Sequence, residues 1–247
     1  MQPDVADRLR RLNREFYQAF AEPFAATRRR LQPGAAAVLG RLPRQASILD
    51  LGCGSGEVAR ALHRRGHHGV YLGLDECAPL LEQARAAGAP PAEFATVDLA
   101  EPGWTAACRP PYDWVLAFAV LHHLPGTARH SFLDGVRAVL APGGFFAFSV
   151  WQFQHSERLL RRIVPWSSVG IDPSQLDAGD HLLDWRHGGR GLRYVHAFEI
   201  GELEALARQT GFRWVDRFES DGQGGRLGLY AVWSPDRASE ARSGAQL

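Results

Sequence analysis

The sequence predicts an α/β protein in which helices flank a doubly wound, mostly parallel β-sheet. Between residues 46 and 151, short β-rich runs alternate with helical stretches, a pattern typical of parallel strands joined by crossover helices. The mostly apolar run Ile48–Leu51 enters a glycine loop that opens a helix. Sheets of this kind bind ligands at the carboxyl ends of their strands, so we expect the functional residues there.

The first two segments are an N-terminal helical region, residues 1–42, and the core, residues 46–151. The N-terminal region is predicted to be helical because large apolar side chains recur along one face: Leu9, Leu12, Phe16, Phe20 and Phe24. The expected core strands are Ser47–Leu51, Val70–Leu74, Glu93–Val97, Trp114–Phe118 and Phe145–Trp151. The expected core helices are Glu57–Arg65, Ala78–Ala87 and Ala128–Leu140, the last ended by a turn at Pro142-Gly143-Gly144.

The alternation ends after Trp151. Residues 152–198 show no sustained period, and a connection of that length is usually functional, so we expect an insert that faces the substrate. A helix at Ile200–Thr210 and a hairpin of Arg213–Glu219 with Leu227–Trp233 are predicted for residues 199–235. We therefore predict one domain over residues 1–235 and a frayed polar tail over residues 236–247.

Composition excludes several chemistries. All 28 basic residues among the 247 are arginine, so Schiff-base catalysis and a phosphate-binding P-loop, which need lysine, are ruled out. The net charge of +1 gives no global field for nucleic acid. The three cysteines form no CxxC pair, which argues against a zinc site, so no metal is expected. The longest apolar run, Trp114 to Leu121, is far short of the ~20 residues of a membrane helix, and we expect a soluble, cytoplasmic protein with no membrane partner.

The glycine loop is the most informative motif. Its spacing is GxGxG, from Gly52 to Gly56, and Glu57 stands where a nicotinamide-binding fingerprint would have its third glycine. Asp75 ends the second expected strand, where a carboxylate can accept hydrogen bonds from both ribose hydroxyls. Asp98 follows the third expected strand, where it can accept from an adenine amino group. The acids predict a nucleoside site without phosphate recognition.

Residues 46–151 resemble a class I S-adenosylmethionine-dependent methyltransferase. Asp50-Leu51-Gly52-Cys53-Gly54-Ser55-Gly56 matches the first motif of that family, and Tyr112-Asp113-Trp114 and Pro142-Gly143-Gly144 match later ones. The resemblance implies a Rossmann-like fold with a seven-stranded, mostly parallel sheet and a C-terminal antiparallel hairpin, and S-adenosylmethionine as cofactor. The cofactor-binding residues that it implies are Asp50, Gly52, Cys53, Gly54, Gly56, Asp75, Glu76, Asp98, Leu99 and Ala119.

A second resemblance covers nearly the whole chain. Residues 16–28, Val120–Leu124, Gly179–Trp185 and Arg193–Phe198 are similar to segments of the tRNA wobble-uridine carboxymethyl methyltransferases, which include the methyltransferase domain of an AlkB homologue. The resemblance implies methyl esterification of a carboxymethyl group on a tRNA uridine, with tRNA as partner. Eukaryotic members need a small activating protein, and the sequence leaves open whether this chain does.

The acceptor side is predicted from the same segments. A carboxylate is already a nucleophile at neutral pH, so esterification needs positioning rather than a general base. Arg193 or Arg28 is expected to bind that carboxylate, whereas Tyr194 and His196 position the uridine base. His122 and His123 either shape the pocket, remove a proton from a neutral acceptor, or make structural hydrogen bonds.

Arginine clusters interleaved with tryptophans are consistent with contacts to a tRNA loop. They are Arg28-Arg29-Arg30, Arg158 with Arg161 and Arg162, and Arg186 with Arg190 and Arg193. Arg28, Trp151, Trp185 and Arg193 are accordingly predicted to bind substrate, although an Arg-biased surface would look similar.

Two alternatives to the tRNA enzyme remain. Val195 and Gln223-Gly224-Gly225 depart from the pattern of the tRNA family, so a small-molecule O- or N-methyltransferase is the second hypothesis. A non-catalytic binding module on the same fold is the third, and the intact glycines and Asp75 argue against it.

Overall fold

The computed structural model describes residues 1–28, 30–89 and 91–236. Over these ranges, seven strands form one sheet in the order β3-β2-β1-β4-β5-β10-β9. The five parallel strands are β1 (Ile48–Leu51), β2 (Tyr71–Asp75), β3 (Ala92–Thr96), β4 (Tyr112–Phe118) and β5 (Leu140–Trp151). The last two, β9 (Phe212–Ser220) and β10 (Gly228–Pro235), are the predicted antiparallel hairpin.

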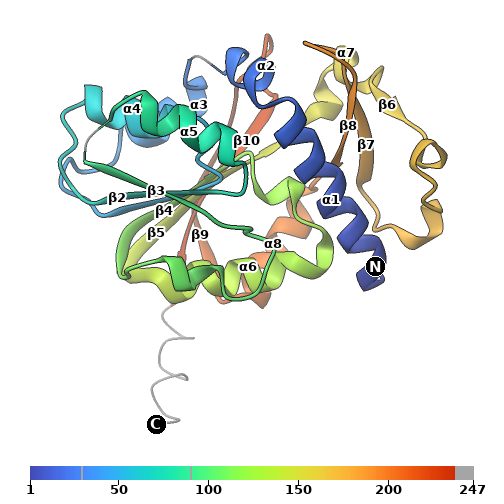
Figure 1. Ribbon diagram of the computed structural model, residues 1–247. Coiled ribbons are helices and arrows are strands. Elements are labelled where there is room, and N and C mark those ends of the chain that lie inside the picture. The colour runs from blue at the N-terminus through green and yellow to red at the C-terminus, as the bar shows by residue number, and fades with distance from the viewer. Residues whose placement is uncertain (29, 90, 237–247) are drawn as a thin grey trace.

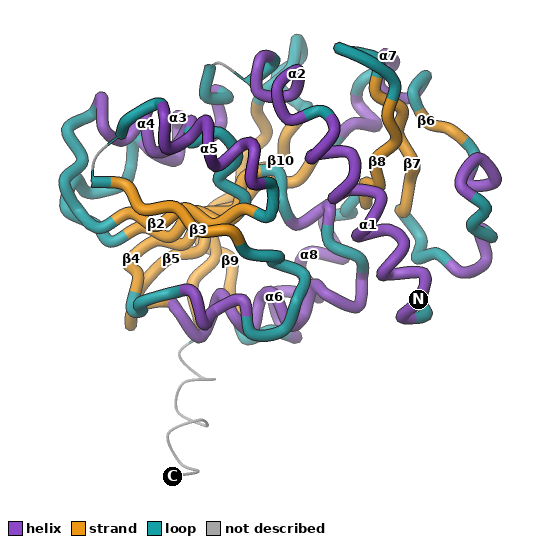
Figure 2. Tube along the Cα trace, in the orientation of Figure 1, coloured by secondary structure: helices purple, strands orange, loops and turns teal. Residues whose placement is uncertain are grey.

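Helices cover both faces of this sheet, as Figure 1 and Figure 2 show. On one face lie α3 (Pro33–Leu39), α4 (Glu57–Arg64) and α5 (Ala78–Ala86), and on the other lie α6 (Gly126–Val139) and α8 (Ile200–Gln209). Each face has its own apolar cluster, one around Ile48 and Leu62 and the other around Leu49 and Phe132. The neighbouring residues Ile48 and Leu49 belong to different clusters, because successive side chains of a strand point to opposite faces and this strand is buried on both.

A second sheet stands beside the first, where the sequence showed no period. It contains β6 (Ile163–Val164), β7 (Asp180–Trp185) and β8 (Gly191–His196) in that order. The long N-terminal helix α1 (Pro3–Ala19) packs against β8, with Val5 and Leu9 in one cluster with Leu182. Two short helices complete the same side of the molecule, α2 (Ala21–Ala26) after α1 and α7 (Glu157–Leu160) before β6.

Two expectations were wrong in detail. The stretch around Pro142 is not a free turn between helix and strand, because β5 begins at Leu140, which pairs with Tyr112 across a register shift. A positive φ of 78° at Gly143 accommodates that irregularity. The segment 152–198 is also more regular than expected, since it supplies all of the second sheet.

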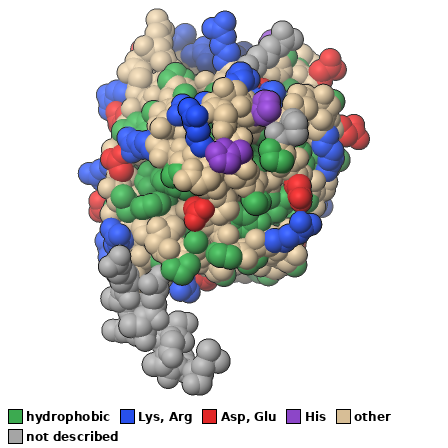
Figure 3. All heavy atoms as spheres, turned by 90° about the vertical axis from the view of Figure 1, so that its left-hand side faces the viewer, with side chains coloured by type: hydrophobic (Ala, Val, Ile, Leu, Met, Phe, Trp, Pro, Cys, Tyr) green, Lys and Arg blue, Asp and Glu red, His purple; other side chains and the backbone are tan. Residues whose placement is uncertain are grey.

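Charged side chains of both signs lie on the surface (Figure 3). Acidic and basic side chains are interspersed on the face shown in Figure 3, in keeping with the net charge of +1. Across the described ranges, no helix combines the length and the apolar character needed to cross a membrane. Arg29 lies outside the described residues, and so do residues 237–247 of the predicted polar tail.

Candidate active site

The carboxyl ends of β1, β2 and β4 open into a cavity of about 630 Å³. Its floor is formed by the glycine loop and the strand ends, and its other walls come from α1, α2 and the second sheet. Nine of the ten predicted cofactor-binding residues line this cavity: Asp50, Gly52, Cys53, Gly54, Asp75, Glu76, Asp98, Leu99 and Ala119. Gly56 does not; it begins α4 at a φ of 80° and packs against Ala84 of α5.

The glycine loop needs glycine for two different reasons. Gly52 and Gly54 have φ angles of 70° and 53°, which L side chains rarely adopt. A Cβ on Gly52 would lie 2.4 Å from the side chain of Val120, whereas a Cβ on Gly54 would meet nothing within 4 Å. Gly52 therefore packs tightly against the protein, and Gly54 leaves its backbone open to a ligand.

Two carboxylates support this loop. Asp75 accepts hydrogen bonds of 2.8 Å from the backbone amides of Gly54 and Cys77. Asp50 accepts a hydrogen bond of 2.6 Å from the hydroxyl of Tyr71. Burial raises the pKa of Asp50 to about 7, with the nearby charge of Asp75 as a smaller contribution in the same direction.

Helix α1 covers the part of the cavity that contains Glu76 and Asp98. Arg10 and Arg14, one turn apart on α1, both form ion pairs with Asp98, and Arg14 also reaches Glu76 at 3.1 Å. The carboxylate of Asp98, which is predicted to contact an adenine amino group, is therefore also bound by two arginines. These acids, the open backbone at Gly54 and the carboxylate of Asp75 fit a cationic nucleoside cofactor such as S-adenosylmethionine.

The other half of the cavity is built around Arg193, which is 4% exposed. Its guanidinium lies 4.5 Å from the ring centre of Trp151, 5.3 Å from that of Phe16 and 5.4 Å from that of Trp185. Among the described residues no carboxylate forms an ion pair with it, and its Nε atom has no hydrogen-bond partner. Burial, followed by the charge of Arg28, lowers the pKa of Arg193. A buried cation without a counter-ion is costly, so this arrangement favours an anionic ligand.

The four predicted substrate residues meet in this half. Arg28, Trp151, Trp185 and Arg193 all line the cavity, and the guanidinium of Arg28 lies 5.8 Å from the ring centre of Trp151. Arg158, Arg162 and Arg186 line it as well. Asp184 pairs with Arg186 at 2.5 Å and lies 3.9 Å from Arg162, so the walls on this side carry more positive than negative charge.

The neighbouring histidines are placed differently from each other. His123 lines the cavity, and both of its ring nitrogens are occupied: Nε2 accepts from the Tyr17 hydroxyl at 2.8 Å and Nδ1 donates to the carbonyl of Tyr194 at 2.9 Å. Burial lowers the pKa of His123 to about 3. His122 lies behind Trp151, on which its ring stacks, and accepts a hydrogen bond from the Trp151 amide. Burial holds the pKa of His122 well below its usual value, so both rings are neutral.

Comparison with known proteins agrees with this geometry. Residues 18–216 match a family described as a methyltransferase domain. The chain belongs to the methyltransferase-domain family. The predicted enzyme class, an S-adenosylmethionine-dependent methyltransferase, is thereby confirmed, and with it the cofactor.

Relatives of this methyltransferase differ in substrate. An Encephalitozoon cuniculi protein, provisionally named as a methyltransferase, is 29% identical over 81% of this chain and 87% of its own length. A trans-aconitate 2-methyltransferase of Methylobacterium radiotolerans is 35% identical over 57% of this chain and 54% of that protein. A tRNA (carboxymethyluridine(34)-5-O)-methyltransferase of Arabidopsis thaliana is 30% identical over 63% of this chain. The chain spans about half of the trans-aconitate enzyme and 37% of the Arabidopsis protein.

Solved structures confirm the predicted fold. The DhpI-SAM-HEP complex is 23% identical, with a TM-score of 0.63 over 90% of this chain and 95% of that chain. The DhpI-SAH complex is 22% identical, with a TM-score of 0.65 over 93% of this chain and 98% of that chain.

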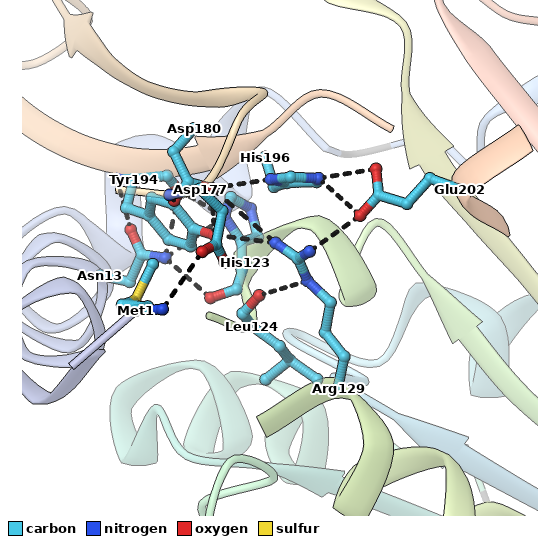
Figure 4. A network of polar contacts seen from close by, with 10 residues as sticks. All are labelled: Met1, Asn13, His123, Leu124, Arg129, Asp177, Asp180, Tyr194, His196 and Glu202. Atoms are coloured by element: carbon cyan, nitrogen blue, oxygen red, sulfur yellow. Dashed lines mark hydrogen bonds and ion pairs between the residues drawn. The ribbon is translucent and has the colours of Figure 1, made fainter. Parts of the chain in front are cut away.

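Tyr194 and His196 of the methyltransferase do not line the cavity. They belong to the buried polar network drawn in Figure 4. The Tyr194 hydroxyl donates to Asp180 at 2.9 Å, and the ring of His196 lies between Asp180 at 2.7 Å and Glu202 at 3.0 Å. Arg129 of α6 binds Glu202 and the Tyr194 hydroxyl. The network joins the second sheet to α6 and α8, away from the predicted uridine base.

Sequence reasoning missed the residues that α1 contributes. Arg10, Asn13 and Tyr17 line the cavity, and Arg14 pairs with two residues that do. The numbers 10, 13, 14 and 17 follow the i, i+3, i+4, i+7 spacing of one helical face. The apolar period of this helix predicts which side of it is buried, but not that its polar residues reach the cavity.

Proposed function

We propose that this methyltransferase esterifies a carboxylate, and that its acceptor is the carboxymethyl group of a wobble uridine in tRNA. The observation that carries the proposal is Arg193, a buried guanidinium without an ionic partner among the described residues, in the wall of the cavity that also contains the glycine loop. A planar guanidinium binds a carboxylate through two parallel hydrogen bonds, which fixes the direction of the carboxylate oxygen.

The chain's own residues have little proton chemistry to perform in such a reaction. When bound, S-adenosylmethionine supplies an electrophilic methyl group. Arg193 orients the acceptor oxygen, and Trp151 with Trp185 keeps water away from the guanidinium. His123 is neutral and uses both nitrogens in hydrogen bonds, which is consistent with an acceptor that needs no general base.

Two observations favour tRNA as the carrier of the carboxylate. One relative is the Arabidopsis tRNA (carboxymethyluridine(34)-5-O)-methyltransferase. Arg28, Arg158 and Arg162 line the cavity on the acceptor side. There the arginines can bind the phosphates of an RNA loop, and the tryptophans can stack on its bases.

A small carboxylic acid is the second candidate. It is favoured by the trans-aconitate 2-methyltransferases, of which one is 35% identical and another, from Streptomyces avermitilis, is 38% identical over 49% of this chain. Arg193 serves either acceptor, because the reacting group is a carboxylate in both.

A labelling experiment separates the candidates. The protein is incubated with S-adenosylmethionine labelled in its methyl group and either bulk tRNA from a strain that lacks this gene or trans-aconitate. We expect label in tRNA that mild base releases as methanol, because esters saponify and N-methyl groups do not. Label in trans-aconitate alone would transfer the assignment to the small acid. Base-stable label, or none in either acceptor, would contradict a carboxylate acceptor.

A further inference from the structure

We propose that Arg28 is a second anion-binding residue of the acceptor site, which makes the enzyme specific for acceptors that carry another anionic group beside the reacting carboxylate. The inference rests on the proposed function, because it assigns the reacting carboxylate to Arg193. It goes beyond that function by naming the class of acceptor, a dianion or polyanion, and by giving the two arginines different tasks.

Arg28 and Arg193 lie against the same tryptophan ring. The guanidinium of Arg28 lies 5.8 Å from the ring centre of Trp151, and that of Arg193 lies 4.5 Å from it. Arg28 also lies 5.3 Å from the ring centre of Phe24 on α2. Both arginines line the cavity, so a single ligand can contact both of them.

The end of α2 fixes the place of Arg28 in the cavity wall. Arg28 is the second residue after α2, and its amide donates a hydrogen bond of 2.9 Å to the carbonyl of Ala25. The Thr27 hydroxyl donates to the carbonyl of Phe24 at 2.7 Å. The last turn of the helix is therefore closed by hydrogen bonds, and the half-buried side chain of Arg28 starts from a defined backbone position.

No acidic residue that the structure describes neutralises either of these cations. Neither Arg28 nor Arg193 forms an ion pair within the described ranges. Asp184, a carboxylate that lines the same half of the cavity, is bonded to Arg186 at 2.5 Å. The oxygens of Asp221, which also lines the cavity, accept from a backbone amide at 3.0 Å and from a phenol at 2.6 Å. Arg28 donates no hydrogen bond to a described residue either, so its N–H groups are available to a ligand.

Two uncompensated cations in one wall favour a ligand with two negative charges. Burial lowers the pKa of Arg193 most, and the charge of Arg28 lowers it further, because like charges repel each other. A monocarboxylate bound to Arg193 would neutralise that residue and leave Arg28 without a counter-ion. A second anionic group on the same ligand pairs with Arg28 and removes the repulsion.

Both acceptors of the proposed function meet this requirement, from different sources. A carboxymethyluridine in tRNA carries a backbone phosphate, and trans-aconitate carries further carboxylates. A guanidinium binds phosphate and carboxylate through the same paired N–H groups, so Arg28 recognises the same chemistry in either acceptor. The test therefore uses one pair of probes for each source, and the members of a pair differ in the second anion.

The first pair is carboxymethyluridine without and with a phosphate on its ribose, and the second is crotonate and trans-aconitate. Dissociation constants are measured by calorimetry with S-adenosylhomocysteine bound, so that binding is observed without methyl transfer. The variants are Arg28→Gln, Arg193→Gln and Arg217→Gln, the last as a matched control. Arg217 lies 5.7 Å from the ring centre of Trp214, outside the cavity, so its replacement removes the same charge from a similar contact with a tryptophan.

We expect the wild type to bind the member with the second anion about tenfold more tightly than its partner in at least one pair, the contribution of one hydrogen bond between charged groups. Arg28→Gln should abolish that preference by weakening only the member with the second anion, whereas Arg193→Gln should weaken both members. Arg217→Gln should leave every dissociation constant within about twofold of the wild type, and so should Arg28→Gln for S-adenosylhomocysteine. A preference in the uridine pair alone assigns the second anion to phosphate, and one in the other pair alone assigns it to a carboxylate.

Each outcome bears on one of the two proposals. A wild type that prefers the second anion in neither pair overturns the role of Arg28, and so does a preference that survives in Arg28→Gln. Either result leaves the carboxylate acceptor standing, provided that an ester forms in the labelling experiment. If neither tRNA nor trans-aconitate forms an ester, the proposed function fails, whatever the dissociation constants show about Arg28.

Discussion

Individual residues of β8 show how far the sequence predicts the site. Arg193, Tyr194 and His196 were assigned together to the acceptor, yet only Arg193 lines the cavity. Side chains alternate between the two sides of a strand, so Tyr194 and His196 share one side and Arg193 points to the other. The strand itself was not predicted, because residues 152–198 show no alternating pattern. Without the strand, the sequence could not show that Arg193 points to one side and that Tyr194 and His196 point to the other.

Nine of the ten residues predicted to bind the cofactor line the cavity, because a glycine loop after an apolar strand fixes local backbone geometry. Gly52 and Gly54 nevertheless differ in a way that their spacing does not show. Replacing each by alanine, which adds one methyl group, tests the difference. Gly52→Ala and Gly54→Ala both place a side chain at positive φ, which costs roughly 1 kcal/mol. Gly52→Ala also overlaps Val120 and should cost a further 1–3 kcal/mol or so.

Urea unfolding of the two variants measures that difference. We expect Gly54→Ala to unfold at a slightly lower midpoint than the wild type, and Gly52→Ala at a midpoint that is clearly lower still. Calorimetry with S-adenosylhomocysteine should show weakened binding in Gly54→Ala, whose added methyl group enters the open cavity. Equal midpoints for the two variants would show that Val120 moves aside without cost.

At the scale of elements, α1 is the helix whose role the sequence understated. Its apolar residues Val5 and Leu9 pack on the second sheet as the period of the sequence indicates. Its polar face contacts both halves of the cavity: Arg10 and Arg14 at Asp98, and Asn13 and Tyr17 at His123. Periodicity predicts which side of a helix is buried, but it does not say that a polar residue on that side meets an unpaired strand edge.

Asn13 is the residue that closes that edge. β8 is the outer strand of its sheet, and the amide and carbonyl of Tyr194 bond to the Asn13 side chain. Asn13→Ala leaves the Tyr194 amide without a partner in a buried place, whereas the Tyr194 carbonyl keeps its hydrogen bond from His123. We expect a loss of about 1–3 kcal/mol in the free energy of unfolding, the cost of an unsatisfied buried polar group.

The measurement is urea unfolding followed by circular dichroism, with Gln18→Ala as the control on the exposed side of the same helix. Gln18→Ala should change stability by less than about 0.5 kcal/mol. A similar small change in Asn13→Ala would mean that water replaces the amide, and that α1 is held by its apolar contacts alone.

For the whole molecule, the buried network of Figure 4 joins the second sheet to the first. Asp180 of β7, Tyr194 and His196 of β8, Arg129 of α6 and Glu202 of α8 are bonded to one another there. The sequence predicted the strands and helices of the core, but this junction forms between residues that lie up to 73 positions apart, and no local pattern marks it. Its charges make the stability of the molecule depend on pH.

His196 sets the sign of that dependence above neutral pH. Burial lowers its pKa, but the carboxylates of Asp180 and Glu202 raise it more, so the net shift is upward. An ordinary histidine in the unfolded chain has a pKa of about 6.5. The stabilisation by protonated His196 is therefore fully present below about pH 6.5 and is lost as the pH rises through the folded-state pKa. His123, whose folded pKa is about 3, has the opposite effect and weakens the fold as the pH falls below about 6.5.

Urea midpoints measured from about pH 5.5 to 9 separate the two contributions, because histidines with an ordinary or a raised pKa titrate in this range. Wild-type stability should decline on the alkaline side, and His196→Gln should flatten that decline whatever its absolute stability. His155→Gln, at an exposed position, should keep the wild-type slope. An alkaline decline that persists in His196→Gln would assign it to another group. Because the junction positions β8, which carries Arg193, the acceptor KM of the wild type should rise over the same pH range in which the midpoint falls.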